Sequence, residues 1–304
     1  MQTEAVDERF TGIDGWPIGK AVEAMWEGQM AAVAAIAPEL GTISEAAEAT
    51  ARRLREGGRL IYAGAGTSGR VAVQDGVELG PTFGWPEDRL DYIIAGGMAA
   101  LSKSIERAED DAAAAIEQVA KLGVMPSDSV VGVAASGRTP FSIAALKAAK
   151  TKGALTIAIA NNKPSDILKV ADYAICAQTG SEVVAGSTRM KAGTAQKAIL
   201  NIFSTAVMIA SGRVYEGLMV DMIISNEKLE ARGASMVGRL AGVDAQLAGA
   251  ALKQAGGHIK CAVLIAMGAR LDDAQALLKE NNNILRQAVD AWRARTGKVN
   301  KTNV

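Results

Sequence analysis

The sequence contains few residues of the types that form metal sites and disulfides. Its 304 residues include one histidine and two cysteines. His258 lies in no cluster of candidate ligands, and Cys176 and Cys261 lie in apolar runs without C-x-x-C spacing. Structural metal sites and disulfide frameworks both need such residues in clusters. We therefore expect no metal site and two buried, reduced thiols in a reducing compartment.

Excess charge of one sign and long apolar runs are also missing. The 33 basic and 33 acidic residues balance to a formal net charge of zero, and they form no block of like charge. This balance argues against nucleic acid or an acidic membrane surface as a partner. No run approaches the roughly 20 apolar residues of a membrane span, and no N-terminal stretch resembles a signal peptide. These absences predict a soluble cytoplasmic protein.

Apolar periodicity divides the chain into three parts. Helical spacing over 18–36 and 43–54 predicts an N-terminal helical arm, residues 1–56. Continuous apolar runs then alternate with helical stretches, which predicts an α/β domain over 57–240 with a doubly wound parallel sheet covered on both faces. From residue 187 onward only helices are expected, including 195–209 and 218–224, and residues 241–304 should form a small helical bundle. The five predicted strands cover residues 60–63, 92–95, 130–134, 155–160 and 173–177.

Two glycine-rich loops carry the first functional signal. Residues 64–70 (Gly-Ala-Gly-Thr-Ser-Gly-Arg) and 135–140 (Ala-Ser-Gly-Arg-Thr-Pro) each follow a predicted strand and open a predicted helix. Unpaired N–H groups at a helix start, the helix dipole and nearby hydroxyls favour phosphate. Ligands in open α/β sheets bind at the carboxyl ends of the strands. The predicted ligand residues are Gly66, Thr67, Ser68, Ser136, Gly137, Arg138 and Thr139.

Each loop also has a simpler interpretation. The first matches G-x-G-x-x-G, but the second strand ends in Ala-Gly-Gly-Met at 95–98 and lacks the carboxylate of a dinucleotide site. The second could be a plain turn in which Ser136 or Thr139 caps a helix that starts with Pro140. Capping and binding are compatible, because a capping hydroxyl can turn to a phosphate oxygen.

Three segments carry a family resemblance: 58–83, the second loop, and 180–197 (GSEVVAGSTRMKAGTAQK). They resemble the N-acetylmuramic acid 6-phosphate etherases, which belong to the sugar isomerase fold group and are related to the glucokinase regulatory protein. The resemblance continues with less force through 226–229 and spans about 59–295. It implies a five-stranded sheet of sugar isomerase type, a phosphosugar substrate, no metal or organic cofactor, and a homodimer. The apolar stretches 195–209 and 218–224 are a candidate interface for such a dimer, or they belong to the core of one chain.

The resemblance also implies a reaction. These enzymes cut the D-lactyl ether of N-acetylmuramic acid 6-phosphate, giving N-acetylglucosamine 6-phosphate and D-lactate. In the open-chain aldehyde the proton on carbon 2 is acidic, so lactate can leave carbon 3 by elimination before water adds. A base must take the proton and an acid must protonate the departing oxygen, and carboxyl groups can fill both roles.

Two glutamates match the acid and base positions of the family. Glu78 lies in the helix that the first loop opens, and we favour it as the acid. Glu109 lies near the start of the next long helix, where an acidic residue could simply stabilise the helix dipole. If the family motif were aligned a few residues out of register, Glu106 or Asp110 would take the place of Glu109. Glu182 is a third candidate carboxylate, since related sugar isomerases use a glutamate in this region as a base.

The signature segment supplies further candidates for substrate binding. Four residues, Ser187, Thr188, Arg189 and Lys191, open a helical stretch, so they could cap the helix and hold the ligand. Arg189 and Lys191 could instead form an ion pair. Departures from the family are Gly80, Ser181 and Gly76, and a glycine inside the helix of Glu78 should loosen it.

Two other functions stay open at this level. A non-catalytic sugar-phosphate sensor would not need both Glu78 and Glu109. An aldose–ketose isomerase should have a histidine that opens the sugar ring, and the sole histidine falls in the C-terminal bundle.

Overall fold

The computed structural model describes residues 1–103 and 105–297 and contains two compact units. Unit 1 comprises Met1–Val77 and Glu87–Val207, and unit 2 comprises Glu78–Pro86 and Met208–Val304. The helices α3 (Gly66–Phe83) and α7 (Lys191–Ala210) begin in unit 1 and end in unit 2. The three-part division expected from the sequence stays a prediction.

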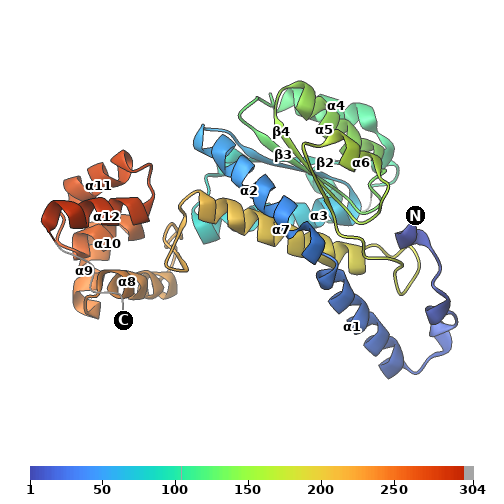
Figure 1. Ribbon diagram of the computed structural model, residues 1–304, viewed down its shortest axis with the longest axis horizontal. Helices are drawn as coiled ribbons and strands as arrows, with labels where there is room; N and C mark the ends of the chain where they lie inside the picture. Colours follow the sequence, from blue (N-terminus) through green and yellow to red (C-terminus); the bar gives the residue numbers. More distant parts are fainter. Residues whose placement is uncertain (104, 298–304) are drawn as a thin grey trace. The chain divides into compact units, whose positions relative to one another are not determined.

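A five-stranded parallel sheet forms the centre of unit 1 (Figure 1). Its order is β2-β1-β3-β4-β5, and the predicted strands are confirmed to within two residues at each end. The residues of β1, β3 and β4 are buried throughout, as expected for strands covered on both faces. The strand bounds are β1 Leu60–Gly64, β2 Leu90–Ile94, β3 Ser129–Ala134, β4 Leu155–Ala160 and β5 Tyr173–Cys176.

Helices cover both faces of this sheet (Figure 1). On one face, α4 (Ala112–Lys121), α5 (Pro140–Thr151) and α6 (Asp166–Val170) pack on Ile61 and Ala63. On the other lie α2 (Leu40–Arg55), α3 and α7, and Tyr62 points to α3. Successive side chains of a strand point to opposite faces, so one apolar run supplies both cores. The doubly wound arrangement is confirmed.

The N-terminal region has three short 3₁₀ turns, η1 (Gln2–Glu4), η2 (Glu8–Phe10) and η3 (Ile13–Gly15), followed by α1 (Ile18–Ala34) and η4 (Ala37–Glu39). One face of α1 buries Ala21, Gly28 and Ala32, and Gln29 is hydrogen-bonded to Thr194 of α7. The other face exposes an apolar stripe made of Ile18, Val22, Trp26, Met30 and Val33.

Among the residues described between α3 and α4 are three further 3₁₀ turns: η5 (Glu87–Arg89), η6 (Met98–Leu101) and η7 (Ala108–Asp110). Glu109 therefore lies in η7, just before α4. Helix α4 begins after Asp111, whose side chain accepts a hydrogen bond from the Ala114 N–H at 2.9 Å. Asp111 supplies the N-cap that separates η7 from the long helix.

Unit 2 contains a helical bundle, as predicted, and a small hairpin that was not. The hairpin consists of β6 (Val214–Tyr215) and β7 (Leu218–Met219), so the helix expected over 218–224 and the absence of strands after 187 were both wrong. Glu216 and Gly217 join the strands with φ of 48° and 73°, the signs of a type I′ turn. The bundle helices are α8 Glu227–Ala241, α9 Ala245–Gln254, α10 Ile259–Ala266, α11 Leu271–Glu280 and α12 Leu285–Thr296.

Membrane-spanning helices and metal-binding clusters are both absent from the described residues. None of the described helices has the length and apolar character needed to cross a bilayer. The same residues contain no group of three or more His, Cys, Asp or Glu side chains arranged to hold a metal ion.

Candidate functional site

The glycines of the first loop serve close packing between β1 and α3. A Cβ on Gly64 would lie 2.9 Å from the Cα of Gly69, which real side chains do not tolerate. Gly66 has a φ of 53°, in the left-handed region that favours glycine. This packing accounts for the G-x-G-x-x-G match without a dinucleotide. It leaves Thr67 and Ser68 in the first turn of α3, at the carboxyl end of β1.

The second loop is also built around a glycine. Gly137 has a φ of 67°, and a Cβ there would lie 2.3 Å from the Cβ of Ser165. The hydroxyl of Ser136 accepts a hydrogen bond from the Arg138 N–H at 3.1 Å. Thr139 is the N-cap residue of α5, yet its hydroxyl makes no capping bond among the described residues. The Thr139 hydroxyl is therefore available to a ligand.

The two loops meet at a cavity of about 380 Å³ at the carboxyl edge of the sheet. This volume is in the range of small-molecule sites. Gly137 is the one predicted ligand of the two loops that is not among the described lining residues; it sets the shape of the second loop. The described residues that line the cavity are Met1, Glu4, Ala65, Gly66, Thr67, Ser68, Glu109, Asp110, Ala135, Ser136, Arg138, Thr139, Pro140 and Thr188.

Carboxyl groups share this cavity with the anion-binding groups. Glu109 and Asp110 reach it from η7, and Glu4 reaches it from the N-terminal segment. Arg107 precedes η7 with a φ of 60°, a conformation that costs an L-residue roughly 1–2 kcal/mol. Backbone strain of this kind often accompanies functional sites. The cavity thus combines a cation, hydroxyls and helix N-termini for an anion with carboxyls for proton transfer.

The N-terminal segment takes part in the cavity, which sequence reasoning missed. Thr3 is fully buried, and its N–H donates to Asn162 Oδ1 at 3.3 Å. Asn162 Nδ2 donates to the Thr3 hydroxyl at 2.9 Å, and the Gly186 N–H donates to the Thr3 carbonyl at 3.2 Å. These bonds bring Met1 and Glu4 to the cavity. An irregular polar start gives no local signal of such contacts.

Glu182 caps the start of α7 with its side chain, and this contact explains its position. Glu182 as a whole residue is 1% exposed. One carboxylate oxygen accepts the Lys191 N–H at 2.9 Å and the other accepts the Ala192 N–H at 3.0 Å, at the start of α7. Glu182 is not one of the described residues that line the cavity. Its role toward substrate stays a prediction, and its contacts are those of an N-cap.

The other signature residues lie on different surfaces. Lys191 Nζ donates to the Ser181 carbonyl at 2.9 Å, and burial lowers the Lys191 pKa. Arg189 lines a shallow groove between α3 and α7. Ser187 donates its N–H to the Val184 carbonyl at 2.9 Å. Only Thr188 of this segment is among the described residues lining the 380 Å³ cavity, so the ligand roles of Ser187, Arg189 and Lys191 stay predictions.

A buried polar network fixes α3 between the sheet and α7. Asp75 of α3 is 4% exposed and accepts the Tyr62 hydroxyl at 2.6 Å. Asn201 Nδ2 donates to the other Asp75 oxygen at 2.6 Å, and the Ser204 hydroxyl donates to it at 3.1 Å. Burial and the Asp75 charge raise the pKa of Tyr62 well above its usual value, so its proton stays in place. Asp75 therefore ties a strand and two helices together.

Gly76, expected to loosen α3, is required by packing instead. A Cβ there would lie 2.5 Å from the Tyr92 Oη and 3.1 Å from Tyr62 Cε2. The two tyrosine rings are stacked with centroids 6.1 Å apart, and they fill the space beside Gly76. Glu78 follows on the same helix, in unit 2, and is not one of the described residues that line the cavity. Its catalytic role stays a prediction.

Comparison with known proteins places this geometry in a family. Residues 42–150 match the family model of the glucokinase regulatory protein N-terminal SIS domain. An inferred phosphosugar isomerase involved in capsule formation, from Bacteroides fragilis, superposes with a TM-score of 0.51 at 20% identity. The match covers 66% of this chain and 95% of that one. The fold is therefore that of the sugar isomerases.

Curated relatives match over more of the chain. The N-acetylmuramic acid 6-phosphate etherase of Geobacillus thermodenitrificans is 42% identical over 95% of this chain and 99% of its own. The enzyme of the same name from Halalkalibacterium halodurans is 43% identical over 95% and 97%. That of Symbiobacterium thermophilum is 49% identical over 76% of each chain. With such identity over nearly its whole length, the chain belongs to the N-acetylmuramic acid 6-phosphate etherase family.

Proposed function

We propose that this chain is a carbon–oxygen lyase that cleaves the D-lactyl ether of N-acetylmuramic acid 6-phosphate. The products are N-acetylglucosamine 6-phosphate and D-lactate. The observation that carries the proposal is a cavity that combines phosphate-type donors with Glu109, in a chain of this family. Ser68, Ser136, Arg138 and Thr139 would hold the phosphate, because hydroxyls, a guanidinium and helix N-termini favour an anion.

The reaction proceeds by elimination and then addition. In the open-chain aldehyde a base removes the carbon 2 proton, the carbon 3–oxygen bond breaks, and an acid gives the departing lactate oxygen its proton. A double bond forms between carbons 2 and 3. Water then adds, with its hydroxyl on carbon 3 and a proton on carbon 2. We assign the acid to Glu78 and the base to Glu109, and the second step uses the same groups in reverse.

The deciding experiment is D-lactate release from N-acetylmuramic acid 6-phosphate. Glu78→Gln and Glu109→Gln should each lower kcat by at least about 10²-fold, the usual contribution of a general acid or base. Glu106→Gln is the matched control for Glu109→Gln and should keep activity, since Glu106 lies three residues before Glu109 but is not one of the described cavity residues. Phosphosugar binding without lactate release would indicate a sensor and refute the proposal. Product formed in heavy water should carry deuterium at carbon 2.

We also propose that two copies of the chain associate through the apolar stripe of α1. Trp26 is 61% exposed and Ile18 is 78% exposed, and a run of such residues on one helix face favours an interface. Trp26→Glu should convert a dimer to a monomer in light scattering after gel filtration. Glu27→Gln on the same helix is the control. A wild-type mass equal to one chain would contradict the dimer.

Peptidoglycan recycling in the cytoplasm is the setting that we propose for this activity. A lactyl ether on an amino sugar is chemistry of the bacterial cell wall, and the phosphate marks a sugar that has entered metabolism. Cys176 and Cys261 are both free and buried, which is compatible with a reducing compartment.

A further inference from the structure

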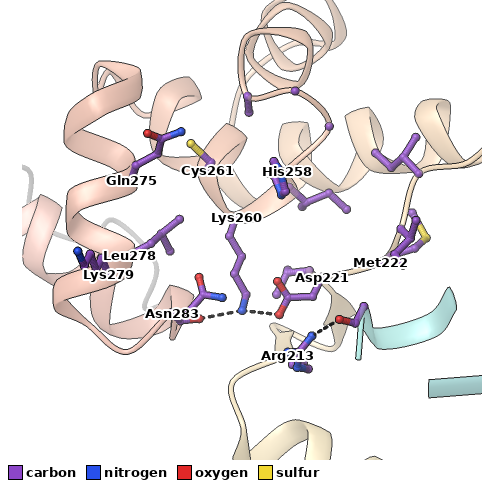
Figure 2. Close-up of a pocket in the computed structure, with 18 residues that line it drawn as sticks. Arg213, Asp221, Met222, His258, Lys260, Cys261, Gln275, Leu278, Lys279 and Asn283 are labelled. Carbon is purple, nitrogen blue, oxygen red and sulfur yellow. Dashed lines mark hydrogen bonds and ion pairs between the residues drawn. The ribbon is translucent and has the colours of Figure 1, made fainter. Parts of the chain in front are cut away.

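A larger cavity, of about 730 Å³, lies within unit 2 (Figure 2). Its walls come from the residue after α3, the segment after β7, the start of α10 and the second half of α11. Its described lining contains three cationic side chains, Arg213, Lys260 and Lys279, against one carboxylate, Asp221. The cavity therefore carries a positive charge excess before His258, which also lines it, is counted.

Lys260 is the centre of this charge. Its side chain is 4% exposed, and Figure 2 shows it extending between Asp221 and Asn283. Its Nζ donates to the Asn283 carbonyl at 2.7 Å and forms an ion pair with Asp221. An ammonium group has three donors, and these described partners account for two. Burying a charged amine is costly unless it is fully paired, so a third acceptor would be favourable.

The start of α10 adds to the attraction of this cavity for an anion. Its N-cap residue is His258, whose side chain makes no capping bond among the described residues. His258, Ile259, Lys260 and Cys261 all line the cavity, so the first turn of α10 faces it. Such a helix end carries unpaired N–H groups and partial positive charge. Apolar side chains, including Met222, Ile224 and Leu278, complete the lining.

We propose that this cavity binds a small organic phosphate. The phosphate group would lie between Lys260 and the start of α10, and the organic part would contact the apolar lining. A cation excess beside a helix N-terminus suits a dianion better than a monoanionic carboxylate. The volume is sufficient for a molecule of sugar-phosphate size.

The cavity is linked to the segment that carries Glu78. Arg213 donates from one nitrogen to the carbonyls of Phe83 and Gly84, both at 2.7 Å, and its guanidinium lies 4.9 Å from the Trp85 ring centroid. Gly84 approaches the Asp221 carbonyl so closely that a Cβ would lie 2.3 Å from it. A bound phosphate that engages Arg213 or Asp221 would therefore act on residues 78–86. Regulation of the reaction by this route rests on the proposed function, whereas binding does not.

Calorimetric titration of the full chain with glucose 6-phosphate tests the binding. The wild type should show two sites, one in each cavity. Arg138→Ala should retain the unit 2 site alone, and Lys279→Glu should weaken that site at least tenfold. Lys253→Glu is the matched control, because Lys253 is an exposed lysine outside the described lining. One site in the wild type, lost with Arg138→Ala, would overturn the proposal.

Two further experiments show which group of the ligand is recognised and whether loss of binding reflects misfolding. Inorganic phosphate should compete for the unit 2 site and neutral glucose should not; competition by glucose would refute phosphate recognition. Lys260→Met combined with Asp221→Asn removes the buried pair together and should abolish this site while the other stays intact. These titrations stand even if no lactate is released, so failure of the reaction and failure of the site are separate outcomes.

Discussion

Gly76 offers a quantitative test of how α3 is packed. Alanine inside a helix is normally more stable than glycine by about 0.5–1 kcal/mol. The structure predicts the opposite sign here, because the added methyl group would lie 2.5 Å from the Tyr92 Oη and 2.9 Å from Tyr92 Cε1. Gly76→Ala should therefore destabilise unit 1.

The magnitude follows from what can move. Tyr62 is fully buried and its hydroxyl is bonded to Asp75, so that ring cannot retreat. Tyr92 must shift instead, and forcing an extra methyl group into a packed site costs about 1–3 kcal/mol. Subtracting the gain in helix propensity from the middle of that range leaves an expected net loss of about 1 kcal/mol.

Urea unfolding of four variants, Gly76→Ala, Gly249→Ala, Tyr92→Leu and the Tyr92→Leu, Gly76→Ala double variant, measures this difference. Gly249→Ala is the control, since Gly249 lies inside α9 and a Cβ added there would meet no atom within 4 Å, so this variant should gain about 0.5–1 kcal/mol. In a Tyr92→Leu background, which removes the nearest ring, the penalty of Gly76→Ala should shrink, leaving only the 3.1 Å approach to Tyr62 Cε2. If Gly76→Ala is as stable as the wild type or more so, the packing argument is wrong.

Three other predictions follow from single contacts. Glu182→Ala removes both hydrogen bonds to the start of α7 and should cost about 1–3 kcal/mol in urea unfolding, whereas unchanged stability would rule out the capping role. Burial pushes the Asp128 pKa upward, but hydrogen bonds from Arg59 and the Met125 N–H outweigh it and lower the pKa. The stabilisation by Asp128 is therefore complete above about pH 4 and lost as pH falls through its lower folded pKa, so Asp128→Asn should flatten the acid side of the stability curve. Parallel curves would contradict this. Arg138→Ala should raise KM for the phosphosugar at least about tenfold by removing a charge-assisted contact, and an unchanged KM would remove Arg138 from the phosphate site.

The sheet could be predicted from sequence because its signal is local. Each strand is a short apolar run between helical stretches, and such runs require a sheet covered on both faces. The same topology brings the loops after β1 and β3 to one edge, since parallel strands end on the same side. The positions of the two phosphate-type loops could therefore be predicted from the strand pattern.

The β6–β7 hairpin was missed because its turn lacks the usual signal. Glu216-Gly217 adopts positive φ at both positions, but asparagine or aspartate normally precedes the glycine in such turns. Gly76 was misread for a related reason. Helix propensity treats it as a weakness, and the rings of Tyr62 and Tyr92 that require it come from β1 and β2. Propensity gives no information on such tertiary contacts.

The residues of the candidate site also fall into two groups, those placed by the sheet topology and those placed by tertiary contacts. Residues in the loop or first helical turn after a strand of the parallel sheet, such as Ser68 and Ser136, must lie at its carboxyl edge, and so their place follows from the topology. The segment before α1 has no such constraint. Thr3 reaches the edge only through paired hydrogen bonds with Asn162, 159 residues away in the sequence. Because that contact is buried and both groups satisfy each other, removing either partner would leave a buried polar group unpaired. Residues placed by the sheet topology can thus be predicted from the strand pattern alone. Glu4 is placed by the hydrogen bonds between its neighbour Thr3 and Asn162, so its position can be predicted only when that pairing is known.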